Sequence, residues 1–94
     1  MIFRPEAEAD VADAFAWYEE QSRGLGSHFL LCMEAALSQI KRHPDASPVV
    51  HRQIRRALLR RFPYGVFYLL EDMRIVVLAV FHAKRNPARW KKRR

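Results

Sequence analysis

Hydrophobic residues recur with a helical period through the first half of the chain. Val11, Ala14, Phe15 and Tyr18 are spaced i, i+3, i+4 and i+7, which places them on one stripe of an α-helix. Proline at position 5 and acidic residues just after it are typical of a helix N-terminus, because proline fits the first turn and carboxylates favour the positive end of the helix dipole. We therefore predict an amphipathic helix from Pro5 to about position 21, with an acidic outer face formed by Asp10, Asp13, Glu19 and Glu20.

A second helix is predicted after the short turn region 22–27. Its apolar positions are Phe29, Met33, Ala36, Leu37 and Ile40, again at helical spacing. The basic residues 41–43 complement its C-terminal dipole, and the proline at position 44 ends it. The first half of the chain is therefore predicted to be an αα-hairpin.

The pattern changes from helical to extended after a polar connection over residues 44–53. Three runs rich in branched and aromatic residues follow, at Ile54–Phe62, Val66–Glu71 and Ile75–His82. The connections between them are too short for crossovers, so they predict a three-stranded antiparallel meander. Residues 1–4 form a short extended piece that can add a strand. The predicted class is α+β: an N-terminal strand, an αα-hairpin, the meander and a short basic C-terminal segment.

The last predicted strands are apolar on both faces. Residues 75–81 contain no polar side chain, and in an antiparallel sheet such a run indicates that both faces are covered. Two helices can cover only one face of a small sheet. The other face must be covered by the C-terminal segment, by a second copy of the chain, or by a different protein, which is the alternative that we favour because the tail is short and strongly basic.

Length and composition predict one domain over residues 1–94. No apolar run approaches the roughly 18 to 20 residues that a membrane span needs, so no membrane association is expected. The start of the chain lacks the charge and hydropathy order of a signal peptide, and the single cysteine, Cys32, lies in the apolar run of the second helix and is interpreted as a core thiol. These features together predict a cytoplasmic protein.

Charge divides the chain into two unlike halves. Residues 1–50 contain four Lys/Arg and eight Asp/Glu, whereas residues 51–94 contain thirteen and two, so the net charges are −4 and +11. A positive field of this size attracts nucleic acid or an acidic protein. We expect the acidic half to be scaffold and the basic half to carry the binding surface.

The candidate functional side chains lie around the first meander strand and after the last one. As target- or anion-binding residues we predict Arg55, Arg56, Arg60, Lys84, Arg89 and Trp90, with the arginines of the first meander strand forming a row across the sheet. If the protein cleaves RNA, the residues available as acid, base and phosphate ligands are His82, Tyr64, Arg61 and Arg85.

Structural alternatives exist for each of these residues. His82 can be a strand-end histidine bonded to backbone, the arginines can form a solvated face or pair with the acidic helix, and Trp90 and Tyr64 can pack over the sheet edge. The four histidines have no ligand spacing and only one cysteine accompanies them, so neither a metal site nor a cofactor is expected. Motifs for nucleotide binding and serine hydrolysis are missing as well.

The sequence resembles the RelE/ParE superfamily of toxins from bacterial type II toxin–antitoxin systems, often labelled plasmid stabilisation proteins. The resemblance covers nearly the whole chain and rests on short matches in the first half: Pro5-Glu6-Ala7 with Asp10, Trp17-Tyr18, Leu25-Gly26 with Phe29, and Ile40 before Pro44 and Pro48. It rests further on two blocks in the second half, residues 55–66 (RRALLRRFPYGV) and residues 82–87 (HAKRNP) with Trp90.

The resemblance implies the same strand, hairpin and sheet order as the periodicity. It also implies a growth-inhibiting toxin, neutralised by a cognate antitoxin whose C-terminal region wraps around it in a hetero-oligomer. Such antitoxin segments are commonly acidic, and one of them would supply the cover for the apolar sheet face.

Members of the superfamily differ in their target. ParE-like members inhibit DNA gyrase, whereas RelE-like members are endoribonucleases that cut mRNA in the ribosome. The block from His82 to Trp90 is more similar to the ParE-like group, so gyrase is the expected target and an mRNA interferase is the alternative. A basic DNA-binding or structural protein is a third hypothesis. The tail 91–94 is expected to be mobile until a partner orders it.

Overall fold

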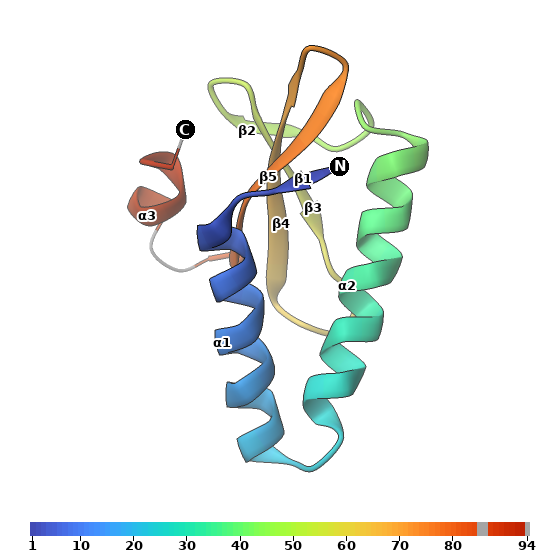
Figure 1. Ribbon diagram of the computed structural model, residues 1–94, viewed down its shortest axis with the longest axis vertical. Helices are drawn as coiled ribbons and strands as arrows, with labels where there is room; N and C mark the ends of the chain where they lie inside the picture. The colour runs from blue at the N-terminus through green and yellow to red at the C-terminus, as the bar shows by residue number, and fades with distance from the viewer. Residues whose placement is uncertain (85–86, 94) are drawn as a thin grey trace.

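The computed structural model describes residues 1–84 and 87–93 (Figure 1). Its elements, in chain order, are β1 (Ile2–Phe3), α1 (Pro5–Gln21), α2 (Leu25–Arg42), β2 (Val49–His51), β3 (Ile54–Leu58), β4 (Tyr64–Glu71), β5 (Arg74–His82) and α3 (Pro87–Lys91). The α+β class, the N-terminal strand and the αα-hairpin are confirmed. No helix within the described ranges has the length and the hydropathy to cross a membrane.

The hairpin turn is tied together by a carboxylate of α1. The Glu19 side chain accepts hydrogen bonds from the backbone N–H groups of Gly24 and Gly26, each at 3.0 Å. These are unpaired donors at the start of α2, so Glu19 caps this helix from outside. Gly26 also allows close approach of the helices, since a Cβ there would lie 2.8 Å from the backbone oxygen of Phe15.

The buried stripe of α1 differs from the predicted one. Ala14 and Tyr18 are buried as expected, but Val11 and Phe15 are only half-buried. Asp10, which we predicted on the outer face, is 9% exposed and lies on the buried stripe instead. Its carboxylate faces the sheet, where it accepts a hydrogen bond from the Val80 N–H.

The sheet is larger than the predicted meander and is mixed. Its strand order is β1-β5-β4-β3-β2, with β1 parallel to β5 and the other pairs antiparallel. The predicted connection 44–53 contains the additional strand β2. The predicted strand Ile54–Phe62 was too long, because β3 ends at Leu58 and residues 59–63 form the loop to β4.

A β-bulge in β5 changes which residues face the helices. Phe67 pairs with Ala79 but Tyr68 pairs with Val77, so Leu78 is an extra residue on β5. Val77 packs in the core beneath the helices, Leu78 and Ala79 both pack on the opposite face, and Val80 is again beneath the helices. The bulge therefore turns the end of β5, including His82, toward the helix side.

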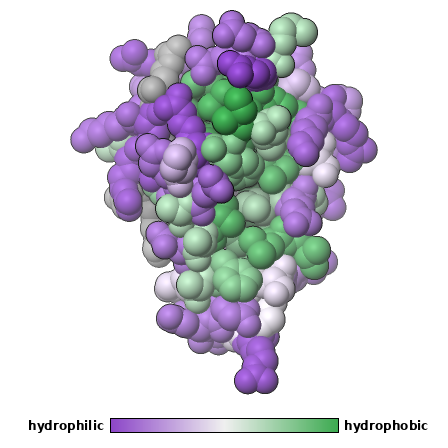
Figure 2. All heavy atoms as spheres, viewed as in Figure 1, coloured by the Kyte–Doolittle hydropathy of each residue, from purple (hydrophilic) through white to green (hydrophobic). Residues whose placement is uncertain are grey.

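Each face of the sheet has its own core. Residues of α1, α2 and one sheet face form the first, and Figure 2 shows hydrophobic side chains in a strip between the two helices. Cys32 is half-buried against this core, as a free thiol. The second core lies on the opposite face and consists of Ile54, Phe67, Leu69, Val76, Leu78, Ala79 and Trp90.

The second core corrects our expectation that a different protein covers the far face. Trp90 of α3 is 5% exposed and stacks on Phe67, with ring centroids 4.4 Å apart. The chain therefore covers this part of the face with its own C-terminal helix. Arg93 beyond α3 donates hydrogen bonds to Asp10, and position 94 is outside the described residues; the mobility of the tail in the free protein stays a prediction.

Candidate functional site

A groove of about 510 Å³ lies between α1 and the end of β5. It is lined by Asp10, Asp13, Ala14, Trp17, Tyr18, Pro63, Tyr64, Val80, Phe81, His82 and Arg89. Two predicted catalytic residues meet in this groove, because Tyr64 pairs with His82 across β4 and β5 and their ring centroids are 5.9 Å apart. The bulge in β5 brings them to the same side.

The hydrogen bonding of His82 limits its chemistry. Its Nδ1 accepts a hydrogen bond from the backbone N–H of Lys84 at 3.3 Å, which assigns the proton of the neutral imidazole to Nε2. With the proton on Nε2, neutral His82 can donate to a ligand from that atom but cannot accept a proton there. The geometry suits hydrogen-bond donation better than general-base catalysis.

Of the other two residues predicted for RNA cleavage, Arg61 lies near the same end of the sheet. Arg61 is exposed in the β3–β4 loop, where it has a left-handed backbone conformation with φ 68°. This loop is joined to the end of β5, since the Ala83 N–H donates to the Pro63 carbonyl at 2.8 Å. Arg85 lies outside the described residues.

The arginines of β3 do not form the predicted row. Arg55 faces the helix side, where its guanidinium donates to the carbonyls of Asp45 at 3.0 Å and Ser47 at 2.7 Å. Its role in this geometry is to hold the connection between α2 and β2. Arg56 projects from the opposite face, as the alternation of a strand requires, and Arg60 is exposed beyond the end of the strand.

Arg56 lies over β4 without a hydrogen-bond partner for its Nε, which is buried. Its stem covers Gly65, where a Cβ would be 2.9 Å from the Arg56 Cγ. A buried donor without a partner typically costs about 1 to 3 kcal/mol. The Arg55 guanidinium holds a loop through hydrogen bonds, whereas the Nε of Arg56 has no hydrogen-bond partner.

The remaining predicted residues are divided between surface and core. Lys84 is exposed, and Arg89 is exposed with its guanidinium carbon 5.1 Å from the centre of the Phe81 ring. Trp90 is in the second core, as the packing alternative described, with His51 as a further ring neighbour at 6.1 Å. A side chain in this position is not presented to a ligand on the surface.

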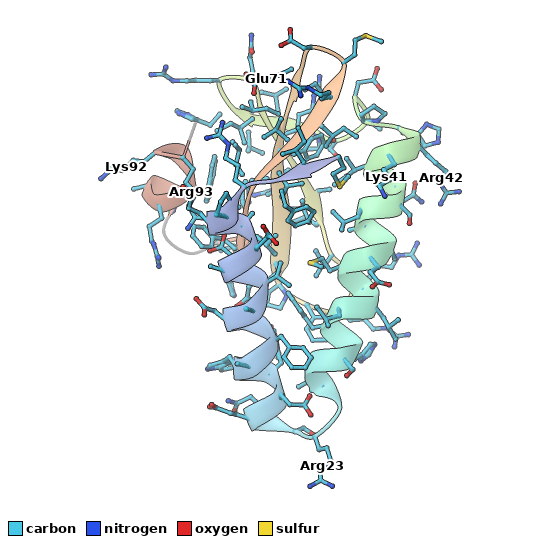
Figure 3. The ribbon with its side chains drawn as sticks, viewed as in Figure 1. Arg23, Lys41, Arg42, Glu71, Lys92 and Arg93 are labelled. Atoms are coloured by element: carbon cyan, nitrogen blue, oxygen red, sulfur yellow. The ribbon has the colours of Figure 1, made fainter. Side chains whose placement is uncertain are left out.

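Sequence reasoning missed the ion pair between Asp10 and Arg93. Figure 3 shows Arg93 reaching back from the end of α3 toward the start of α1, whereas Lys92 points away. Arg93 pairs with the Asp10 carboxylate, with one contact of 3.2 Å, and also donates to the Leu78 carbonyl at 3.3 Å. Asp10 in turn accepts from the Val80 N–H at 3.0 Å. The two side chains thus hydrogen-bond to the edge of β5 beyond its pairing with β1, where no strand in the described part of the chain continues the sheet.

A second groove, of about 340 Å³, lies between α2 and the edge of β3. Its lining residues are Cys32, Ala35, Ala36, Ser38, Gln39, Arg42, Ala57, Leu58 and Arg60. The side chain of Leu58 is 57% exposed. Sequence reasoning missed this groove because it depends on β2 being shorter than β3. The strand β2 was not predicted, and the end of β3 was predicted too far along the chain.

The edge of β3 is open beside this groove. The Arg56 N–H donates to the Pro48 carbonyl, so the backbone of Arg56 faces β2, and by alternation that of Leu58 faces the same way. The pairing of β2 with β3 stops at Arg55. The Arg56 carbonyl and both backbone groups of Leu58 are therefore available to an added strand. Across residues 1–84 and 87–93, no three His, Cys, Asp or Glu side chains gather as a metal-binding group.

Comparisons with known proteins agree on one family. Residues 1–87 match the family described as the ParE toxin of the type II toxin–antitoxin system, parDE. The chain is 31% identical over 81 residues to the protein named Toxin ParE2 in Mycobacterium tuberculosis strains CDC 1551 and H37Rv, with 85% of this chain and 77% of each relative covered.

The fold has a solved counterpart. A structure titled "Chromosomal ParDE TA system from P. aeruginosa" matches with a TM-score of 0.65 and 16% identity, over 85% of this chain and 90% of the other. At this identity the likeness concerns the arrangement of strands and helices. It supports the mixed sheet and the αα-hairpin described above.

Proposed function

The chain belongs to the ParE toxin family of type II toxin–antitoxin systems, and we propose that it arrests growth in the cytoplasm by binding DNA gyrase. The observation that favours binding over catalysis is the hydrogen bond to Nδ1 of His82. It leaves neutral His82 without a free base nitrogen toward the groove. A toxin that acts by docking needs a shaped and charged surface but no acid/base pair.

Gyrase inhibition is tested with purified components. The protein is expected to block DNA supercoiling by gyrase in a concentration-dependent manner, and addition of the cognate antitoxin is expected to restore it. Normal supercoiling at saturating protein contradicts the proposal. The protein with Met73→Ser, a fully exposed residue of the β4–β5 turn, serves as a matched control that should inhibit like the original.

Ribosome-dependent mRNA cleavage is the second candidate, and the contact between Tyr64 and His82 beside the Arg61 loop supports it. In this case His82 must move its Nδ1 away from Lys84 to accept a proton. His82→Ala is then expected to abolish toxicity while the far-UV and near-UV spectra stay unchanged. Cleavage should occur only with ribosomes present. Full toxicity of the variant excludes this candidate.

For the antitoxin we propose an acidic, extended segment that binds the groove between α2 and β3. The floor of the groove is apolar and its charged residues are Arg42 and Arg60, with no carboxylate among the lining residues. The open backbone groups of Arg56 and Leu58 fit a segment that adds as a strand. A second copy of this chain fits less well, because its net charge of +7 repels an identical surface.

Leu58→Glu tests this docking site, because it places a negative charge where the acidic segment would lie. Its affinity for the antitoxin, measured by titration calorimetry, is expected to fall by about tenfold or more. Met73→Glu makes the same kind of change on the remote β4–β5 turn and is expected to leave the affinity unchanged. Equal affinity for both variants places the antitoxin elsewhere.

A further inference from the structure

We propose that Arg56 and Arg89 form a carboxylate-binding site on the sheet face covered by α3, at the cross-strand pair of Gly65 and Phe81. The ligand that we infer is an acidic side chain of a protein partner. This site is separate from the groove between α2 and β3. It goes beyond the proposed function, because it holds whether or not gyrase is the target.

The first argument is the contrast between neighbouring arginines. Arg55 donates to two carbonyls and is fixed by the fold. Arg56 is half-buried, yet its Nε has no partner and no hydrogen bond or ion pair joins its guanidinium to any described residue. The Nε is closed to solvent, so an anion from outside can reach only the terminal nitrogens of this guanidinium, which are not buried.

The second argument is the glycine beneath Arg56. Gly65 lies diagonally across from Arg56, which pairs directly with Phe67. The Arg56 stem occupies the space of the missing side chain, since a Cβ on Gly65 would lie 2.9 Å from Cγ and 3.2 Å from Cδ. Gly65 thus lets Arg56 cross β4 in the direction of Phe81, its partner on β5.

The third argument is the charge that gathers over Phe81. The guanidinium carbons of Arg89 and Arg93 lie 5.1 Å and 4.4 Å from the centre of its ring. Arg93 is neutralised by Asp10, but no described carboxylate forms an ion pair with Arg89 or Arg56. Two cations without an ion-pair partner among the described residues therefore lie beside the Gly65–Phe81 pair, and Arg89 also lines the groove between α1 and β5.

The surroundings favour a carboxylate over a nucleic-acid backbone. The half-buried Phe81 ring, which packs against the buried Phe67 and Trp90, forms the apolar floor beside these cations. A single carboxylate matches the planar fork of a guanidinium and brings one charge with an aliphatic stem that can rest on such a floor. A phosphodiester strand brings a charge with every nucleotide and needs a continuous track of cations. An Asp or Glu side chain of a partner is the better match.

The site is tested on the isolated chain by NMR of the arginine Nε–H groups. Sodium acetate, added at constant ionic strength, is expected to shift the Arg56 and Arg89 signals saturably, with a Kd on the order of 1 to 10 mM for so small a ligand. Arg56→Lys, which keeps the charge but loses the planar fork, and Arg89→Gln are each expected to weaken acetate binding roughly tenfold. Arg23→Gln, at the tip of the αα-hairpin, is the control and should not change it (Figure 3).

Gly65→Ala supplies an independent check, because its Cβ displaces the Arg56 stem without removing a charge. It is expected to weaken acetate binding while the backbone amide spectrum remains that of a folded protein. An Arg56 shift that does not saturate, or an acetate affinity read from the Arg89 signal that is unchanged in Arg56→Lys and Gly65→Ala, overturns the proposal. Saturation by inorganic phosphate at a concentration tenfold or more below that of acetate assigns the site to phosphate groups and overturns the carboxylate assignment.

Discussion

At the scale of single residues, Asp10 has the most informative position. It shares the buried stripe of α1 with Ala7, Ala14 and Tyr18, a spacing that is itself helical. Its carboxylate accepts a backbone N–H of β5 and pairs with Arg93, so one side chain joins α1, the sheet edge and the C-terminal segment. Asp10 therefore does more than favour the helix dipole, because its carboxylate also connects these three segments.

Replacing Asp10 by Asn should destabilise the protein by about 3 kcal/mol, because it leaves the Arg93 guanidinium partly buried without a counter-charge. The measurement is urea unfolding followed by far-UV circular dichroism. Asp13→Asn is the matched control, since Asp13 is exposed on the same helix and should change stability by less than about 0.5 kcal/mol. Equal stabilities of the two variants mean that the ion pair contributes nothing measurable.

At the scale of elements, the helices could be predicted from the sequence and the sheet could be predicted only in part. The i, i+3, i+4 pattern predicted α1 and α2 within a few residues, because a long amphipathic stripe has few alternative structures. The end of β3 could not be predicted, since Leu59 and Phe62 are as apolar as the strand but belong to the following loop. The helix α3 was missed because it has only five residues and lies among basic residues. Trp90 is its one buried side chain, which is too little to show a helical period.

The sequence predicted which residues belong to the candidate site, but not on which face of the sheet each side chain lies. The sequence identified His82, Tyr64, Arg56 and Arg89 as residues of interest, and the structure brings the first two together. The side of the sheet that His82 faces depends on the bulge at Leu78, and a single inserted residue leaves no signal in an apolar run. The different hydrogen bonding of Arg55 and Arg56 likewise could not be predicted, because Arg55 is bonded to the connection that leads to the unpredicted strand β2.

The helix α3 should be necessary for stability, and Trp90→Ala tests this. Trp90 is 5% exposed and closes the second core, so truncation is expected to cost about 3 to 5 kcal/mol. For a domain of this size that is a large part of the total, and a marked drop in the melting temperature should follow. Trp17→Ala removes the same side chain from a position that is 55% exposed and should have a much smaller effect. If both variants melt alike, α3 does not stabilise the sheet.

At the scale of the whole molecule, the division of charge has a structural explanation. The acidic first half contributes the hairpin, β1 and part of β2, and the basic second half contributes the rest of the sheet and α3, but not all of its cations face solvent. Arg55 holds a loop and Arg93 is paired with Asp10. Among the other described cations, Arg42 and Arg60 line the groove between α2 and β3, and Arg89 lies over Phe81.

This arrangement predicts different salt dependences for a protein partner and for nucleic acid. A partner held by the apolar groove and strand edge of β3 should lose less than about tenfold in affinity between 50 and 200 mM salt, since few of its contacts are charge pairs. Binding to duplex DNA through several phosphates should weaken by roughly a thousandfold over the same range, because each neutralised phosphate releases counterions. The two affinities are measured side by side at both salt concentrations, with the cognate antitoxin and a DNA duplex of arbitrary sequence. A salt-insensitive DNA complex, or an antitoxin complex that weakens as steeply as the DNA complex, contradicts the docking geometry and supports a basic protein that recognises phosphate chains instead.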